Sequence, residues 1–435
     1  MNGDTIFALA SGAGRAAVAV MRISGPATRG LLEALAERVP EPRRASLRRL
    51  RHPGTGEALD QALLLWFPGP ASYTGEDSAE FHLHGGPAVV AGVAEALVAA
   101  GARPAEPGEF TRRAFLHGKL DLTAAEGIAD LIEAETAAQR RQALRQAGGA
   151  LARLYGSWAA RLTALLARQE AFIEFEDEDL PAGLDDEVAA AAAVLRAEIL
   201  AHLADGGRGE RLREGLLVAI LGAPNAGKSS LLNALVGREA AIVSARAGTT
   251  RDVVEARLDL AGIPVTLADT AGLREALDEI EAEGVRRARL RAGEADLRLL
   301  VFAADEPPDA DTLALMGPGA LVVVNKVDLP VAAGMPEGLH VSARSGAGLD
   351  ALHLRLEAEA VSRASTMGEA TLTRPRHRAA LQDAVSWLGE LEVAPVPELR
   401  AEALRAALRA IGRITGHIGV EAVLDLVFGE FCIGK

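Results

Sequence analysis

The sequence of 435 residues has one cysteine, 3% aromatic residues and no long apolar run. A single cysteine, Cys432, excludes an internal disulfide framework and fits a reducing compartment. No apolar run approaches the roughly 20 residues that span a bilayer. The start, MNGDTIFALA, lacks the pattern of a secretory signal and has no glycine at position 2 for myristoylation. We therefore expect a cytoplasmic protein that does not span a membrane.

The chain also lacks an excess of positive charge, because 60 acidic residues outnumber 46 lysines and arginines and the formal net charge is -14. This balance disfavours non-specific wrapping of nucleic acid, since phosphate contacts need a positive surface. Three basic clusters remain, at 42–51, 286–291 and 374–378. Taken alone, each is best interpreted as a solvated helix face, although a local patch is compatible with contact to RNA.

The length predicts about three domains. Residues 1–117 carry apolar strand patterns at 17–24, 61–67 and 79–84, separated by Gly/Pro turns, and this predicts an α/β domain. From 118 to 212 strand signals vanish, and one long amphipathic helix is predicted over 122–146. The acidic run 174–181 is interpreted as a solvated interhelix loop rather than a metal site.

The next part, 213–363, alternates apolar runs with helical stretches. The runs are 215–222, 263–270, 295–305, 319–328 and 339–343. Their continuous apolarity predicts a parallel sheet covered by helices on both faces. Residues 364–435 are helical again, with a break at 393–398. An α/β domain between two helical stretches suggests an insertion into one helical domain, 118–212 plus 364–435.

A phosphate-binding motif follows the first of these runs. Residues 222–229, GAPNAGKS, fit G-x-x-x-x-G-K-S between a predicted strand and a predicted helix. Glycines let backbone N–H groups cradle phosphate, and the helix N-terminus adds a positive dipole end. Lys228 is predicted to reach the β and γ phosphates, and Ser229 to offer its hydroxyl to Mg²⁺.

Further elements follow the motif in order. Asp269-Thr270-Ala271-Gly272 ends one apolar run, and Asn325-Lys326-Val327-Asp328 ends another. A carboxylate at Asp328 can accept both N1–H and the 2-amino group of guanine, which indicates GTP rather than ATP. A backbone N–H in Ser342-Ala343-Arg344 can bond guanine O6. The segment 248–252, GTTRD, is predicted to be a switch in which Thr250 is the second Mg²⁺ hydroxyl.

The glutamine that orients water in Ras-like enzymes is absent, because Leu273 stands after D-x-x-G. Hydrolysis therefore needs another group, and spacing does not choose among the acidic candidates that follow: Glu275, Asp278, Glu279, Glu281 and Glu283.

These motifs make the sequence similar to the MnmE (TrmE) family of tRNA-modification GTPases. The resemblance covers the whole chain, and its more specific segments lie outside the GTPase motifs: 4–11 with 21–26, 72–87, 107–132 and the tail FCIGK. It implies an N-terminal α/β folate-binding-like domain (1–117) that also dimerises, and a helical domain split by an inserted Ras-like P-loop G domain (213–363).

The resemblance also implies the chemistry. A K⁺-activated GTPase works with an FAD-dependent partner, MnmG, in a heterotetramer and places an aminomethyl or carboxymethylaminomethyl group on C5 of the wobble uridine of certain tRNAs. A folate such as 5-formyltetrahydrofolate supplies the carbon. The implied GTP-binding residues are Asn225, Ala226, Gly227, Lys228, Ser229, Ser230, Ser244, Ala245, Arg246, Ala247, Gly248, Thr249, Thr250, Asp269, Thr270, Ala271, Gly272, Asn325, Lys326, Asp328, Ser342, Ala343 and Arg344.

Carried over residue by residue, the family's water-positioning glutamate matches Glu281. Its K⁺ ligands match Asn225, Ser244, Arg246 and Thr249, where the family usually has threonine in place of Ser244 and an apolar residue in place of Arg246. Its folate contacts match Arg22, Glu80, Lys119 and Lys435.

Two histidines, His82 and His84, share one face of a predicted strand. A metal pair is conceivable there, but no third ligand is evident, so we favour a structural role.

The tail CIGK has the spacing of a C-a-a-X lipidation box, but Gly434 and Lys435 do not fit the pattern. The resemblance instead implies a tail that folds back toward the folate site. The role of Cys432 stays open between a reactive thiol and a small residue that lines the site.

Two other functions compete with this reading. An Era- or Der-type ribosome-assembly GTPase shares the P-loop motifs, but a basic RNA-binding appendage is then expected. A lipidated signalling switch rests on the C-a-a-X spacing alone.

Overall fold

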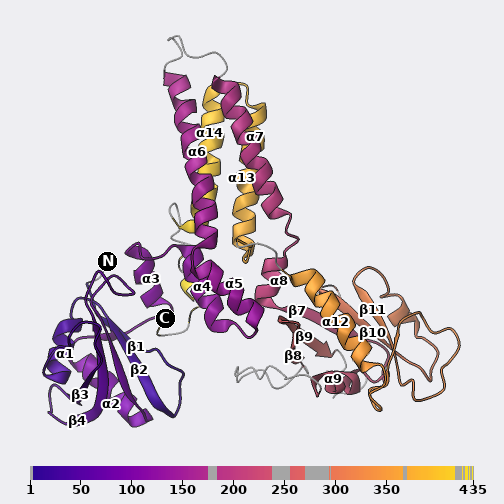
Figure 1. Ribbon diagram of the computed structural model, residues 1–435, viewed down its shortest axis with the longest axis horizontal. Coiled ribbons are helices and arrows are strands. Elements are labelled where there is room, and N and C mark those ends of the chain that lie inside the picture. Colours follow the sequence, from indigo (N-terminus) through magenta and orange to yellow (C-terminus); the bar gives the residue numbers. More distant parts are fainter. Residues whose placement is uncertain are drawn as a thin grey trace, which may run out of the picture. The chain divides into compact units, whose positions relative to one another are not determined.

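The computed structural model describes residues 3–174, 184–237, 255–269, 293, 295–365, 370–416, 424, 427–429, 431 and 434 (Figure 1). The chain divides into two compact units. The first comprises Met1–Ala129, Gln146–Arg161 and Leu408–Lys435, and the second comprises Asp130–Arg145 and Leu162–Ala407. Within the described ranges, every helix is too short or too polar to cross a membrane. The division into three domains stays a prediction.

The first unit is built on a six-stranded sheet of order β3-β4-β5-β2-β1-β6. Its strands are β1 (Ile6–Leu9), β2 (Ala16–Ser24), β3 (Ser46–Arg51), β4 (Ala58–Phe67), β5 (Ser78–Gly85) and β6 (Arg103–Pro104). The pairs are antiparallel except β1 with β6. The strands predicted at 17–24, 61–67 and 79–84 are therefore confirmed.

Helices α1 (Thr28–Ala36) and α2 (Pro87–Ala99) cover one face of this sheet. Alternation along β5 sorts its side chains, since Phe81 and Leu83 are buried in the core that the two helices share with the sheet. Glu80, His82 and His84 lie on the opposite face, which carries polar groups.

Two further helices of this unit, α3 (Glu109–Leu116) and α4 (Leu122–Glu133), are followed by α5 (Ala137–Ala147) and α6 (Ala150–Glu174). The C-terminal segment packs against α4, because Phe428 and Phe431 share a buried cluster with Leu122 and Ala125. Phe428 also lies 6.3 Å, centroid to centroid, from Phe115 of α3. The tail is thereby anchored on the first unit.

The second unit holds a sheet of order β12-β11-β10-β7-β9-β8. Its strands are β7 (Leu216–Leu221), β8 (Glu255–Leu260), β9 (Ile263–Asp269), β10 (Leu297–Ala303), β11 (Ala320–Asn325) and β12 (Leu339–His340). All neighbours are parallel except β8 and β9. The five predicted strands are confirmed, but the expectation of a wholly parallel sheet is wrong at β8. This strand pairs with β9 across the two-residue turn at 261–262, and such a tight connection forces an antiparallel pair.

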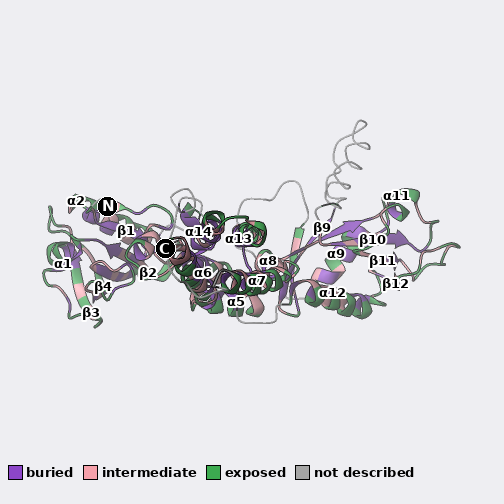
Figure 2. Cartoon of the chain, turned by 90° about the horizontal axis from the view of Figure 1, so that it is seen from above, coloured by how far each residue is buried: buried purple, intermediate pink, exposed green. Residues whose placement is uncertain are grey.

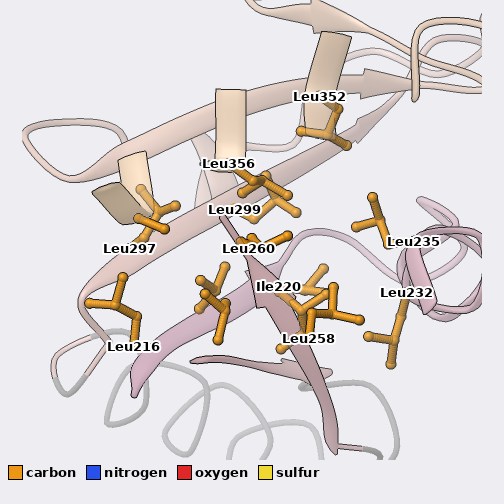
Figure 3. Packing of buried hydrophobic residues seen from close by; sticks show 14 of the residues in the cluster. Leu216, Ile220, Leu232, Leu235, Leu258, Leu260, Leu297, Leu299, Leu352 and Leu356 are labelled. Atoms are coloured by element: carbon orange, nitrogen blue, oxygen red, sulfur yellow. The ribbon is translucent and has the colours of Figure 1, made fainter. Parts of the chain in front are cut away.

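Helices α8 (Arg208–Glu214), α9 (Lys228–Val236), α11 (Ala310–Leu313) and α12 (Leu349–Ala364) accompany this sheet. Figure 3 shows Leu232 and Leu235 of α9, together with Leu352 and Leu356 of α12, packing against leucines and Ile220 of the strands. Strands β7, β9 and β10 are mostly buried along their length, whereas α12 has an exposed outer side (Figure 2). Such burial explains the continuous apolar runs of the sequence.

A helical bundle makes up most of the rest of the second unit, although the start of α6 and the end of α14 belong to the first. Helices α7 (Leu184–Leu203), α13 (Pro375–Val393) and α14 (Pro397–Thr415) run beside α6 (Figure 1). Arg196 of α7 donates to the carbonyl of Val385 on α13, and Gln169 of α6 donates to the carbonyl of Pro397. The helices before and after the inserted sheet therefore form one bundle, as the sequence predicts.

The long helix predicted over 122–146 is wrong, because the chain forms α4 and α5 with a break between them. Oε1 of Gln139 accepts hydrogen bonds from the backbone N–H groups of Glu135 and Thr136, and Thr136 Oγ1 accepts from the N–H of Gln139. This reciprocal arrangement is a capping box, T-x-x-Q, which starts a new helix inside an otherwise continuous apolar pattern.

The basic clusters also differ from the prediction. Residues 46–51 form the edge strand β3 rather than a helix face, because Leu50 packs into the sheet core while Leu47 and Arg49 point outward. The cluster 374–378 opens α13 and is not a solvated face, since Arg374 and His377 are buried. The clusters at 286–291 and 175–181 lie outside the described residues.

Candidate functional sites

The predicted phosphate loop joins the end of β7 to the first turn of α9. Gly227 has φ of +87°, and a Cβ there would stand 2.3 Å from the side-chain nitrogen of Asn325. Asn225 also has a left-handed backbone, with φ of +64°. Left-handed residues of this kind turn successive N–H groups inward and form a concave anion site. The loop therefore has the conformation that the motif predicts.

Lys228 is 6% exposed, and its Nζ donates to the carbonyls of Gly222 at 2.9 Å and Ala223 at 2.7 Å. The ammonium group thus lies over the loop and has to exchange carbonyl partners for phosphate oxygens when a nucleotide binds. Next to it, Ser229 Oγ donates to Oδ2 of Asp269 at 2.5 Å. A hydroxyl and a buried carboxylate side by side are oxygen groups of the kind that Mg²⁺ prefers.

Asn325 joins two loops of the site. Its Nδ2 donates to the carbonyl of Ala226 at 3.0 Å, and its Oδ1 accepts from the N–H of Ala343 at 3.1 Å. The side chain is 1% exposed at the end of β11. Asn325 therefore holds the phosphate loop against the segment 342–344 in addition to any contact with a base.

Asp328 lies on the surface beside this junction. Ser342 Oγ donates to its Oδ1 at 2.6 Å, and this hydrogen bond lowers the pKa of Asp328. Lys326 has φ of +64°, and its Nζ donates to Asp305 at 3.3 Å. A carboxylate that stays ionised and is oriented by a hydroxyl can accept two N–H donors of guanine.

Topology explains why these groups meet. β7, β9 and β11 are parallel and end at one edge of the sheet, and the chain leaves β7 for strands on both of its sides. Ligands of open α/β sheets bind outside the carboxyl ends of the strands at such a switch point. The predicted residues lie at or directly after the ends of β7, β9, β11 and β12: 225–230, 269, 325, 326, 328 and 342–344. Residues 244–250, 270–272 and Glu281 lie outside the described residues.

A second polar site lies on the first unit, where β2 and β5 are neighbours. Arg22 and Glu80 are directly opposite in the register, and Nε and Nη2 of Arg22 donate to Oε1 of Glu80 at 3.2 and 2.9 Å. The guanidinium carbon of Arg22 lies 5.7 Å from the ring centroid of Tyr73 and 5.9 Å from that of Phe110. Two predicted folate residues thus form one ion pair between aromatic rings.

Tyr73 was not predicted from the sequence. Its hydroxyl is 2.9 Å from Thr111 Oγ1, and partial burial raises its pKa. The same loop approaches Lys119, since a Cβ at Gly75 would stand 3.6 Å from Cγ of Lys119. The third predicted residue is therefore next to the loop that carries Tyr73. The sequence signal was the turn-rich stretch SYTGED, which directly precedes β5.

A network of ion pairs around the buried Arg113 supports this loop, and the sequence does not predict it. Arg113 donates to Glu76 at 3.2 Å, to Asp4 at 2.8 Å and to Glu109 at 2.9 Å. Arg103 donates to both oxygens of Glu109 and to Asp4. Burial raises the pKa of Asp4, but hydrogen bonds from the two arginines outweigh it and the pKa is lowered. No spacing rule points to this network, because its members come from three separate segments.

The two histidines of β5 lie on one face, as predicted, and each has a carboxylate neighbour. His84 Nδ1 is 2.7 Å from Oδ1 of Asp60, and His82 Nε2 is 3.6 Å from Oε2 of Glu80. In the described part of the chain, no group of three or more His, Cys, Asp or Glu residues could hold a metal ion.

The tail reaches the strand pair that carries Arg22. A Cβ at Gly434 would stand 2.4 Å from the carbonyl oxygen of Leu9, at a φ of +99°. Leu9 follows Ala8, and Ala8 is directly opposite Arg22 in the register of β1 and β2. Cys432 and Lys435 lie outside the described residues.

The sheet order, the left-handed loop before α9 and the converging side chains define the class as a P-loop nucleotide-binding protein with a Ras-like strand order. Comparison with known proteins narrows this class. The model of the MnmE helical domain matches residues 122–432, and that of the GTP-binding protein TrmE N-terminus matches residues 5–119.

Curated relatives named tRNA modification GTPase MnmE match along the whole chain. The protein from Gluconacetobacter diazotrophicus is 58% identical over 99% of this chain and 98% of its own length. The one from Granulibacter bethesdensis is 57% identical over 100% of both, and the one from Methylorubrum populi is 58% identical over 99% and 98%. The chain belongs to the MnmE family of tRNA-modification GTPases.

Proposed function

We propose that the chain is a K⁺-activated GTPase that modifies C5 of the wobble uridine, U34, of certain tRNAs. It would act as a homodimer and, in a heterotetramer with an FAD-dependent partner of the MnmG type, add an aminomethyl or carboxymethylaminomethyl group. A one-carbon unit from 5-formyltetrahydrofolate or a related folate would supply the carbon. The observation that carries the GTPase part is the contact of Ser229 with Asp269 beside the buried Lys228.

At the phosphate site, Lys228 would give up the carbonyls of Gly222 and Ala223 for phosphate oxygens, and the inward N–H groups of the loop would hold the rest. Ser229, with Thr250, would hold Mg²⁺, while Asp269 orients the serine hydroxyl. A bound Mg²⁺ would neutralise part of the negative charge of the phosphates. Asn325, Asp328 and the segment 342–344 would select guanine.

The proposed K⁺ ligands are Asn225, Ser244, Arg246 and Thr249, and Glu281 would orient the attacking water. Asn225 supports this proposal because it has a left-handed backbone within the proposed phosphate loop. A monovalent cation there supplies positive charge of the kind that an arginine finger provides in other GTPases.

At the second site, Arg22, Glu80, Lys119 and Lys435 are the proposed folate residues. An ion pair walled by Tyr73 and Phe110 supports this assignment, because a planar ring with N–H donors can pair with the carboxylate and stack on aromatic groups. Lys119 would meet the acidic tail of such a ligand.

Two measurements test the proposal. Nucleosides of tRNA from cells that lack this protein should show unmodified wobble uridines, and a Ser229→Ala gene should not restore them. GTP turnover of the purified chain should be several-fold faster in K⁺ than in Na⁺. Unchanged wobble uridines would overturn the assignment to tRNA modification, whereas equal turnover in both salts would overturn the K⁺ requirement. Normal uridines together with defective ribosome assembly would favour an Era- or Der-type function.

A further inference from the structure

His82 lies in the middle of the open face of β5. Its cross-strand neighbours are Leu63 on β4 and Val20 on β2, which are both apolar. Along β5 itself, Glu80 lies on one side of His82 and His84 on the other. Its Nε2 atom is buried and, within the described part of the chain, has no hydrogen-bond partner.

A buried ring nitrogen without a partner is unusual in a native structure and calls for an explanation. His84 provides the contrast on the same face, since its Nδ1 is 2.7 Å from Asp60 although its side chain is 72% exposed. Among the described residues, the charged group nearest to Nε2 of His82 is Oε2 of Glu80, at 3.6 Å, just beyond hydrogen-bond distance.

Glu80 is held on one side only. Its Oε1 accepts two N–H groups of Arg22, whereas Oε2 accepts no hydrogen bond from a described residue. A carboxylate that recognises two adjacent N–H donors of a planar ring has to lie in the plane of that ring, because each oxygen accepts one of two parallel hydrogen bonds. Arg22 fixes the first oxygen, and a small turn of either side chain brings the second to Nε2 of His82.

We propose that His82 is a positioning residue for Glu80. Its Nε2–H group donates to Oε2 when the ligand binds and so aligns the carboxylate with the N–H donors of that ligand. This inference rests on the proposed function, in which the ligand is a reduced folate whose ring carries a 2-amino group and an adjacent ring N–H. The Nε2 atom itself is buried, which limits competition from water for this hydrogen bond.

The test is the affinity of the full-length chain for 5-formyltetrahydrofolate and for the analogue that lacks the 2-amino group, measured by calorimetry. His82→Leu should weaken binding of the natural ring about ten-fold, the value of one hydrogen bond to a charged group. The affinity for the analogue should fall much less, so the ratio of the two affinities becomes smaller. His82→Gln should recover most of the affinity for the natural ring and most of the discrimination, because the glutamine amide can donate a hydrogen bond over a similar distance.

His84→Leu is the matched control, on the same strand and face but one step further from Glu80, and its affinity should stay within about two-fold of the wild type. Melting temperatures of all variants establish that they are folded. Unchanged discrimination in His82→Leu, or an equal loss for both ligands, would overturn the positioning role while leaving the folate site standing. A wild-type chain that binds neither ligand would overturn the proposed folate function and this inference together.

Discussion

Replacing Asn325 with alanine should destabilise the protein even when no nucleotide is bound. The buried amide donates to the carbonyl of Ala226 and accepts from the N–H of Ala343. Alanine removes both hydrogen bonds, each worth about 1 kcal/mol, and leaves two backbone groups without that partner. We expect the free energy of unfolding to fall by about 2–4 kcal/mol.

The assay is thermal unfolding of the chain after removal of nucleotide and Mg²⁺ with a chelator. For a unit of this size, each 1 kcal/mol shifts the midpoint by roughly 2–4 °C, so Asn325→Ala should melt roughly 5–15 °C lower. Asp328→Ala is the matched control from the same motif. Its carboxylate is exposed and bonded to Ser342, so its midpoint should shift much less.

Both variants should lose affinity for guanine nucleotides. Binding data alone therefore do not separate a role in contacting the nucleotide from a role in stabilising the protein. Stability without nucleotide does separate the structural role from the binding role, because Asn325 is buried and makes two hydrogen bonds to two loops, whereas Asp328 is exposed and accepts one hydrogen bond from Ser342. If Asn325→Ala melts with the wild type, or if both variants lose the same stability, the reasoning from these two hydrogen bonds is refuted.

Three further predictions concern other parts of the chain. Asp130→Asn should cost on the order of 3 kcal/mol of stability in urea unfolding, because Arg213 and Arg374 both donate to this buried carboxylate. Acid should destabilise the first unit as the pH falls through the lowered pKa of Asp4, since the unfolded state then binds more protons; Arg113→Met should flatten the decrease between about pH 5 and 3 in circular dichroism. Gly434→Ala should weaken folate binding and leave GTP turnover unchanged, because its Cβ would clash with a carbonyl oxygen of β1.

The nucleotide site could be predicted from the sequence because each of its parts is local. A phosphate loop needs left-handed residues, a lysine and a hydroxyl within eight positions, and 222–229 supply them. Asp269 and Asn325 each end a continuous apolar run, and parallel strands bring such ends to one edge. The sequence does not predict strand β8, because it is not a continuous apolar run. Only part of the strand is buried, and its sequence, EARLDL, mixes charged and apolar residues.

The second site depended on a resemblance, because its residues are ordinary when taken singly. Arg22 and Glu80 are 58 positions apart and meet through the register of β2 and β5. Arg113 reaches Asp4 across 109 positions. Periodicity shows that such residues lie on a strand or a helix, but it carries no information about which distant segment will face them.

The segment 374–378, where the inserted domain joins the bundle, is another case in which the sequence does not reveal the distant partners of its charged residues. Composition alone favours a solvated helix face for RPRHR. In the fold, the chain enters the inserted sheet through α8 and returns at α13, so these two segments have to be held together. Arg378 donates to Glu210 of α8 and to Asp205, across 168 and 173 positions, and Arg374 meets Asp130, which also binds Arg213 of α8. These arginines are therefore ion-pair partners rather than solvated charges, and they hold α8 to the start of α13. Helix α8 directly precedes β7 and the phosphate loop, and α13 belongs to the bundle. The charges at the start of α13 therefore oppose a movement of α8.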